Sequence, residues 1–480
     1  MNIIGREWEI NKFNELYNSD KAELAVVYGR RRVGKTFLID EALHGKITFR
    51  HAGLSPIECA DKQNMLKKQL KHFYNSLLLH GMKKSHVPQS WLEAFFMLEM
   101  HLQYIDKGER LVVFLDELPW MDTPRSGFMT AFEGFWNTWA CHRHNLMLVV
   151  CGSATSWVQD KLIANHGGLY GRVTCPMKLS PFTLYECERF FASKGVKLSR
   201  YDIVQSYMIF GGIPYYLDFF QRGMSLDQNV NRILFGKNPL LEDEYNRLFA
   251  SVFSNPADMK CIIEALSRRH RGYTRQELSE MTGLVANGAF SKMLKALVAS
   301  DFVVEYVPFG CSKRDVHYKL TDAFCWFNLR FVKGRDGLSK DFWAGDAGQN
   351  VVAWRGIAFE EVCFNHVSQL KAALGIGGVQ TKQSAWAVPG DEEAEGTQMD
   401  LVIERNDHIV NMCEMKFYND DYCVTKDYER KLVHRQHVLA PQLAKRTVIH
   451  NTLVTTYGLK YNEYSGAFQN VVTLEDLFKE

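Results

Sequence analysis

Residues 29–36 have the side chains and the spacing needed to hold the phosphates of a nucleotide. They read Gly-Arg-Arg-Arg-Val-Gly-Lys-Thr, follow the apolar run 25–28 and precede a helix expected over 36–43. The two glycines let successive backbone N–H groups face one point, where the helix N-terminus adds positive potential. Lys35 can then reach the β- and γ-phosphates of ATP, and the Thr36 hydroxyl can ligate Mg²⁺. The predicted nucleotide-binding residues here are Gly29, Arg30, Arg31, Arg32, Val33, Gly34, Lys35, Thr36 and Phe37.

Acidic and hydroxyl side chains follow two further apolar runs. Residues 111–115 lead into Asp116 and Glu117, and residues 146–151 lead to Ser153. Ligands of a parallel α/β sheet bind at the carboxyl ends of its strands. We therefore predict that Asp116 shares the Mg²⁺ ion and that Glu117 polarises the attacking water. Ser153 either contacts the γ-phosphate or the water, or only caps its strand.

These runs, with a further strand expected over 46–51, alternate with helical segments. Such alternation is typical of a parallel sheet flanked by helices. The predicted fold class of the N-terminal part is therefore α/β, with the phosphate-binding loop directly after a buried strand.

Five short boxes in the first 220 residues resemble, in their order, those of the archaeal-type ATPases of the AAA+/STAND group. They lie at residues 3–9, 30–36, 116–120, 169–172 and 211–216. The resemblance implies a P-loop ATPase domain followed by a helical lid, with the Gly-Gly-Ile-Pro box at 211–214 forming a turn in that lid.

The same resemblance implies roles for three more residues. Gly5 and Arg6 would lie near the adenine edge, although they could equally form a simple N-terminal clasp. Arg172 would act as an arginine finger or sensor that offsets charge in the transition state. If Arg172 serves a neighbouring subunit, the protein must be a homo-oligomer; the alternative is an ordinary surface ion pair.

Residues 255–332 have the pattern of a winged helix. Thr274 and Glu277 form a helix-capping signature, Gly283 makes a turn, and a second helix is expected over 287–299 before a hairpin around Gly310. This arrangement is common in DNA-binding proteins. The basic run 268–271 could contact phosphates, or the module could simply pack between two domains.

A carboxylate–lysine group lies in the C-terminal third. Two apolar runs separated by a turn at 406–407 predict a hairpin that carries Asp400 on one strand and Glu414 and Lys416 on one face of the other. A helix expected over 353–374 carries Glu360 and Glu361. Two or three carboxylates can hold Mg²⁺, and a lysine can stabilise developing charge on a phosphodiester. The predicted catalytic residues are Asp400, Glu414 and Lys416, and the predicted metal ligands are Glu360 (or Glu361), Asp400 and Glu414.

This D-x(13)-E-x-K spacing resembles the PD-(D/E)XK nuclease superfamily, and its position behind an archaeal-type ATPase resembles the DUF234 architecture. The resemblance implies a C-terminal α/β domain of the restriction-endonuclease type. An inactive relic of that fold, or a surface ion pair on a strand, is the alternative. The expected domains are a P-loop ATPase domain (1–195), a helical lid (196–250), a winged helix-turn-helix (251–335) and a nuclease-like domain (336–480).

The charge composition limits the kinds of molecule that the chain as a whole is expected to bind. The formal net charge is +2 and charged residues make up 23%, so the chain as a whole is not strongly basic. A local basic face remains, on a helix expected over 426–438 with Lys426, Arg430, Lys431, His434 and Arg435. The 11 cysteines lie among apolar residues without a C-x-x-C pair, which indicates buried reduced thiols in a cytoplasmic protein. No apolar run is long enough for a bilayer.

The function predicted from the sequence is Mg²⁺-dependent ATP hydrolysis coupled to a DNA-directed C-terminal domain. Two alternatives remain open at this stage. One is a nucleotide-dependent regulatory switch whose C-terminal domain binds nucleic acid or protein without cutting it. The other is a toxin-like or defence protein that is inactive until a signal arrives.

Overall fold

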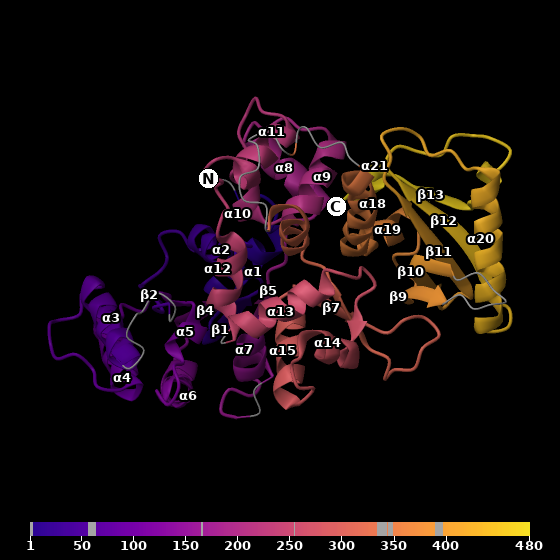
Figure 1. Ribbon diagram of the computed structural model, residues 1–480. Coiled ribbons are helices and arrows are strands. Elements are labelled where there is room, and N and C mark those ends of the chain that lie inside the picture. The colour runs from indigo at the N-terminus through magenta and orange to yellow at the C-terminus, as the bar shows by residue number, and fades with distance from the viewer. Residues whose placement is uncertain are drawn as a thin grey trace. The chain divides into compact units, whose positions relative to one another are not determined.

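The computed structural model describes residues 3–55, 64–164, 167–253, 255–333, 343, 349–388 and 397–480. The chain forms two compact units (Figure 1). The first unit contains residues 1–181, 246–259 and 292–301, and the second contains residues 182–245, 260–291 and 302–480.

The first unit is built on a sheet of five parallel strands in the order β2-β3-β4-β1-β5. The strands are β1 (Glu23–Tyr28), β2 (Phe49–Ala52), β3 (Leu111–Asp116), β4 (Leu146–Gly152) and β5 (Cys175–Lys178). Residues of the central strands β3 and β4 are buried throughout, as expected for strands covered on both faces. The parallel α/β prediction is confirmed. β4 lies between the strand that precedes the phosphate loop and the strand that ends in the two acids.

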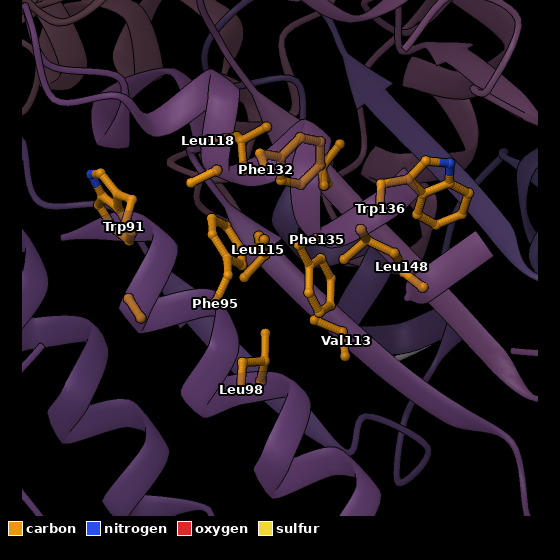
Figure 2. Close-up of a cluster of buried hydrophobic side chains, with 14 of the residues drawn as sticks. Trp91, Phe95, Leu98, Val113, Leu115, Leu118, Phe132, Phe135, Trp136 and Leu148 are labelled. Atoms are coloured by element: carbon orange, nitrogen blue, oxygen red, sulfur yellow. The ribbon is translucent and has the colours of Figure 1, made fainter. Parts of the chain in front are cut away.

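Helices connect these strands, and the crossover from β2 to β3 contains two of them. The helices are α1 (Glu7–Tyr17), α2 (Lys35–Ala42), α3 (Met65–Leu79), α4 (Trp91–Ile105), α5 (Leu118–Met121), α6 (Phe128–Thr138) and α7 (Thr155–Val158). Figure 2 shows the aromatic core that α4 and α6 form against the sheet. Phe95 of α4 stacks on Phe135 of α6 with ring centroids 5.3 Å apart. This packing holds β3, and with it the acidic strand end, against the helical layer.

The second unit begins with the helices α8 (Leu184–Ser193), α9 (Arg200–Phe210), α10 (Pro214–Leu217) and α11 (Leu226–Val230). Helix α8 precedes the range 196–250 predicted for the helical lid, and the other three helices lie within that range. Gly211 and Gly212 both have left-handed φ, and Pro214 occupies the first turn of α10. A Cβ on Gly212 would lie 2.3 Å from the Phe182 carbonyl oxygen, so the turn requires glycine there. The Gly-Gly-Ile-Pro box is therefore a turn, as predicted, and it joins α9 to α10.

The helices and the hairpin predicted within residues 255–332 are present. Thr274 and Glu277 make a reciprocal capping box at the start of α14 (Arg275–Thr282), which ends at the left-handed Gly283. The hairpin strands are β7 (Val303–Tyr306) and β8 (His317–Leu320), and β6 (Tyr273–Thr274) pairs with β8. The remaining helices of this region are α12 (Glu244–Val252), α13 (Pro256–Leu266), α15 (Gly288–Ala299) and α16 (Ala323–Phe327).

A mixed sheet in the order β13-β12-β11-β10-β9 forms the C-terminal part. Its strands are β9 (Thr381–Val388), β10 (Thr397–Arg405), β11 (Ile409–Lys416), β12 (Val448–Thr455) and β13 (Asn470–Val472). The predicted hairpin is the antiparallel pair β10–β11, and β12 adds parallel to β11. The flanking helices are α18 (Gln349–Asn365), α19 (Val367–Ala373), α20 (Lys426–Leu439) and α21 (Leu474–Leu477). Residues 389–396, between β9 and β10, lie outside the described residues.

Two expectations need correction. The single helix predicted over 353–374 is two helices that meet at His366, where the imidazole bonds to Val362 and Leu184 and the backbone leaves the helical conformation. The described cysteines are all free thiols, but Cys261, Cys311 and Cys423 are exposed rather than buried. No helix among the described residues is long and apolar enough to cross a membrane.

Candidate functional site

The phosphate loop takes its shape from glycine and from a neighbouring strand exit. Gly29 has φ of 145°, and a Cβ there would lie 2.2 Å from the carbonyl oxygen of Leu179, just after β5. Gly34 has φ of 90° and begins α2 from the left-handed conformation. Arg32 also has positive φ. Alternation of left- and right-handed residues turns backbone N–H groups toward one side, which is the geometry of an anion-binding loop.

Lys35 lies inside this loop. Its side chain is buried, and Nζ donates to the carbonyl oxygens of Gly29 and Arg30, both at 3.0 Å. Burial lowers the pKa of Lys35. Arg30 is also buried, at 2% exposure, whereas Arg31 and Arg32 are partly exposed. Arg31 and Arg32 are therefore the two guanidinium groups of the loop that a ligand from solvent can reach.

Thr36 and Asp116 meet although 80 residues separate them. The Thr36 hydroxyl donates to Oδ2 of Asp116 at 3.0 Å, and Oδ1 of Asp116 accepts from the Glu117 N–H at 2.9 Å. The strand ends of β1 and β3 thus place two hard oxygen donors side by side. This pair fits Mg²⁺, which binds through one or two protein oxygens with phosphate and water oxygens completing its shell. Among the described residues, no cluster of three or more His, Cys, Asp or Glu side chains could hold a metal by itself.

Glu117 is held by Ser153. The Ser153 hydroxyl lies 3.0 Å from both carboxylate oxygens of Glu117, and the Ser153 N–H donates to one of them at 3.1 Å. Glu117 itself has a left-handed backbone, with φ of 46°. Such a conformation is rare for a residue other than glycine and is typical of sites where the surroundings determine the backbone. The Ser153 hydroxyl therefore contacts Glu117, the predicted catalytic acid, and does more than cap the end of β4.

Two contributors to this site carry no sequence signal. Cys151, at the end of β4, donates its thiol to Oδ1 of Asp116 at 2.6 Å, and burial raises the pKa of that thiol well above its usual value. Gln69 of α3 is fully buried and donates to the carbonyl oxygens of Trp120 and Leu54. Gln69 thereby ties the acidic turn to the segment after β2. The contact between Cys151 and Asp116 could have been predicted only if the pairing of β4 with β3 had been known.

The remaining predicted residues of the N-terminal part lie at the edges of the site. Arg6 donates to the carbonyl oxygen of Ser180 and pairs with Glu9 at 3.5 Å, so it ties the N-terminus to the chain that leaves β5 beside Gly29. Gly5 precedes it with a left-handed φ. Arg172 is exposed, on a turn closed by its own N–H to the Leu169 carbonyl oxygen.

The C-terminal carboxylate–lysine group is present on β11. Lys416 Nζ lies 2.5 Å from one oxygen of Glu414, and Arg435 of α20 pairs with the other. Burial alone would raise the pKa of Glu414, but the two cations hold it below its usual value. Asp400 lies in β10, next to Leu401, which pairs with Cys413. The side chain of Asp400 lies outside the described residues.

Glu360 and Glu361 of α18 have a histidine and a lysine as their partners. His270 Nε2 lies 2.8 Å from Glu360, and Lys319 pairs with Glu361. Burial raises the pKa of Glu360 to about 8, and Glu414 and Lys416 are near enough to influence it. The predicted third carboxylate, Glu360, is thus near Glu414 and Lys416 of β11, but its hydrogen-bond partner is His270. The sequence could not predict this partner, because a local pattern does not indicate which distant side chain a carboxylate meets.

The predicted basic surfaces differ in how open they are. On α20, Lys426, Arg430 and Lys431 are exposed, but Arg430 lies 3.6 Å from Asp427 and Arg435 is engaged with Glu414. In the run before α14, Arg269 pairs with Glu277 and His270 with Glu360, which leaves Arg268 and Arg271 as its exposed cations. Each of the two basic surfaces is therefore only partly available to a phosphate backbone.

Comparison with known proteins agrees with the geometry of the first unit. Residues 3–220 match a family described as an ATPase domain predominantly from Archaea. An uncharacterized protein of Methanocaldococcus jannaschii is 24% identical over 442 residues, which cover 90% of each chain. An uncharacterized ATP-binding protein of the same organism is 44% identical over 44 residues, or 9% of this chain and 75% of that protein.

Among solved structures, a Walker-type ATPase of Pyrococcus abyssi is 19% identical, with 68% of this chain and 96% of that chain covered and a TM-score of 0.43. The family match spans the loop, the acidic strand end and the lid turn. Residues 3–220 of this protein thus match an archaeal-type ATPase domain.

Proposed function

We propose that this protein hydrolyses ATP with Mg²⁺ and uses the nucleotide cycle to control a nucleic-acid-directed C-terminal domain. The observation that carries the first part is the contact between Thr36 and Asp116 at 3.0 Å, beside a buried Lys35. It brings a phosphate-binding loop and a carboxylate to one point, as nucleotide hydrolysis requires.

The residues have distinct roles in this proposal. Backbone N–H groups of 29–36 and Lys35 hold the phosphates, while Thr36 and Asp116 would hold Mg²⁺, which neutralises charge on the β- and γ-phosphates when bound. Glu117 accepts a proton from, and orients, the attacking water. Ser153 positions the Glu117 carboxylate, and Arg6 fixes the chain beside Gly29.

Substitution of two residues tests hydrolysis. Lys35→Ala removes the phosphate-binding ammonium, so we expect ATP binding to be lost. Glu117→Gln keeps the shape but removes the base, so we expect binding to persist while the hydrolysis rate falls by about 10²–10⁴-fold. Binding is measured by calorimetry and hydrolysis by phosphate release, each with and without EDTA.

Glu109→Gln is the matched control, because Glu109 is exposed near the opposite end of β3. Unchanged ATP binding in Lys35→Ala, or unchanged hydrolysis in Glu117→Gln, would contradict the proposal.

A second candidate activity, metal-dependent cleavage of nucleic acid, is favoured by the C-terminal sheet. Glu414 and Lys416 lie on one face of β11, Glu360 is close enough to act on Glu414 electrostatically, and α20 presents an exposed cationic face. Asp400, Glu414 and Glu360 would hold the metal, which would polarise a phosphodiester, and Lys416 would stabilise the charge that develops.

Cleavage is tested with plasmid, single-stranded DNA and RNA, in Mg²⁺ or Mn²⁺ and with or without ATP. We expect Glu414→Ala, Lys416→Ala and Asp400→Ala to abolish cleavage while ATP hydrolysis continues. Glu404→Ala, on the same hairpin, is the control. Binding of nucleic acid without any cleavage by the parent protein would favour the alternative of a nucleotide-dependent switch.

We also propose that Arg172 acts as an arginine finger: its guanidinium would stabilise the transition state of hydrolysis in a neighbouring copy of the chain. Its exposure on a turn of the first unit leaves it accessible to a second molecule. Hydrolysis per chain should then rise with protein concentration in the parent and remain low and constant in Arg172→Ala.

A further inference from the structure

Helix α4 has two apolar faces, and within the part of the chain that the structure describes only one of them is buried. Trp91, Phe95 and Leu98 point into the core of the first unit (Figure 2). The opposite face presents four large apolar side chains, each more than half exposed: Leu92 (62%), Phe96 (59%), Met100 (52%) and Tyr104 (72%). They are spaced four residues apart, so they form one continuous ridge along the helix. We name these four residues the α4 ridge.

Exposed apolar side chains also occur elsewhere in the described chain, including Leu79 at 86% and Trp8 at 61%. Val285 and Tyr461 are also exposed, at 74% and 94%, but each stands in a separate loop. Single exposed apolar residues are ordinary on a protein surface, whereas a contiguous apolar patch marks an interaction site. The ridge has no role in the ATP site, because the site contacts described above come from α2, α3 and the strand ends.

The two ends of the ridge carry opposite charge. Glu93 lies in the first turn of α4, beside Leu92, where its carboxylate also accepts from the Gln89 N–H and lies 2.6 Å from His86 Nε2. At the other end, Lys83 Nζ lies 5.5 Å from the centre of the Tyr104 ring, and Lys84 and Lys107 are exposed nearby in sequence. An antiparallel second copy of the same helix would place its lysines against Glu93 and its glutamate against Lys83. The helix macrodipoles would then also oppose each other, which is the favourable arrangement.

We propose that the α4 ridge is the contact between two copies of this chain, which pack α4 against α4 antiparallel about a two-fold axis. A two-fold contact requires that residue i meets j whenever j meets i. The ridge meets this condition when Leu92 faces Tyr104 of the second copy and Phe96 faces its Met100. Ridges spaced by four residues pack into each other at about −50°, the commonest crossing angle in globular proteins.

The size of the ridge sets the strength of the contact. Side chains of this size expose about 200 Å² each when free, so the four exposed fractions amount to on the order of 500 Å² per copy. Two copies would bury about 1,000 Å², which is at the low end for specific association. The dimer should therefore dissociate in the micromolar range, and its population should rise with protein concentration.

Sedimentation equilibrium of the full chain tests this directly. We expect the parent protein to dimerise reversibly with concentration and Phe96→Asp to dissociate at least about tenfold more readily, since a buried charge on the axis would be desolvated. Val285→Asp, which adds the same charge at an equally exposed position outside the ridge, should match the parent. A parent that stays monomeric, or a Phe96→Asp protein that dimerises like the parent, would overturn the proposal.

Cross-linking tests the register without relying on a charged substitution. Phe96→Cys and Met100→Cys proteins are prepared separately and then mixed under mild oxidation. The antiparallel register predicts disulfide-linked dimers between the two variants in greater yield than in either alone. The parent, oxidised in parallel, shows the background from its exposed Cys261, Cys311 and Cys423. A mixture that gives no more product than the parent would exclude this contact.

Discussion

His366 is a fully buried imidazole whose two ring nitrogens both have partners. Its Nδ1–H donates to the Val362 carbonyl oxygen at 2.7 Å, and its Nε2 accepts from the Leu184 N–H at 2.9 Å. The second contact requires a neutral ring, because a protonated Nε2 cannot accept. Burial accordingly lowers the pKa of His366 to about 4. This residue links the start of lid helix α8 to the break between α18 and α19.

The depressed pKa predicts a loss of stability in acid. Between pH 6.5 and about 4, the unfolded chain binds a proton that the folded imidazole rejects, so stability falls as the pH drops through this window. From pH 7 to pH 5 the contribution of His366 is a loss of about 2 kcal/mol. We expect His366→Gln to be less stable at pH 7 but to lose less stability on acidification, as measured by urea denaturation at both pH values.

His437→Gln, which alters an exposed histidine on α20, serves as the control and should follow the parent. If His366→Gln and the parent lost equal stability on acidification, the neutral imidazole would not be required.

At the scale of elements, the exit of β1 shows how two glycines of one loop differ. Gly29 and Gly34 both have positive φ, but only Gly29 faces another backbone, since a Cβ on it would lie 2.2 Å from the carbonyl oxygen of Leu179. Leu179 N–H also donates to the Tyr28 carbonyl oxygen at 2.7 Å, so the exits of β1 and β5 are joined. A methyl group at residue 29 would therefore separate two paired strands.

We expect Gly34→Ala to cost about 1–3 kcal/mol, which is the strain of one residue in an unfavourable backbone region. Gly29→Ala should cost more, because it adds a clash with the backbone of a second element to the same kind of strain. Chemical denaturation of both variants measures the difference. Equal destabilisation would show that β5 does not constrain the loop.

At the scale of the molecule, the phosphate loop belongs to one of two compact units, so nucleotide should stabilise them unequally. ATP with Mg²⁺ at about 100 times the dissociation constant adds about 2.7 kcal/mol to the unit that binds it. We expect calorimetry of the full chain to show an upward shift of one unfolding transition with nucleotide, and no shift in Lys35→Ala. A shift that persists in Lys35→Ala would place nucleotide binding elsewhere.

Many secondary-structure elements of this protein could be predicted from short stretches of its sequence. The strand–loop–helix at residues 23–42, the Thr274 capping box and the hairpin carrying Glu414 are all encoded within short stretches, where turn chemistry and burial period act directly. The helix break at His366 was missed, because it depends on a bond to Leu184, 182 residues away.

By itself, the sequence determined where a motif of the phosphate-binding type lies, which strand ends carry acids, and that the N-terminal part has a parallel α/β fold. Only the tertiary structure decided that β4 lies between β1 and β3, so that Cys151 and Ser153 meet Asp116 and Glu117. It also decided which apolar face of α4 is buried. The reason is physical: backbone geometry is specified by neighbours in the chain, whereas the order of strands and the partner of a charge depend on packing between distant segments.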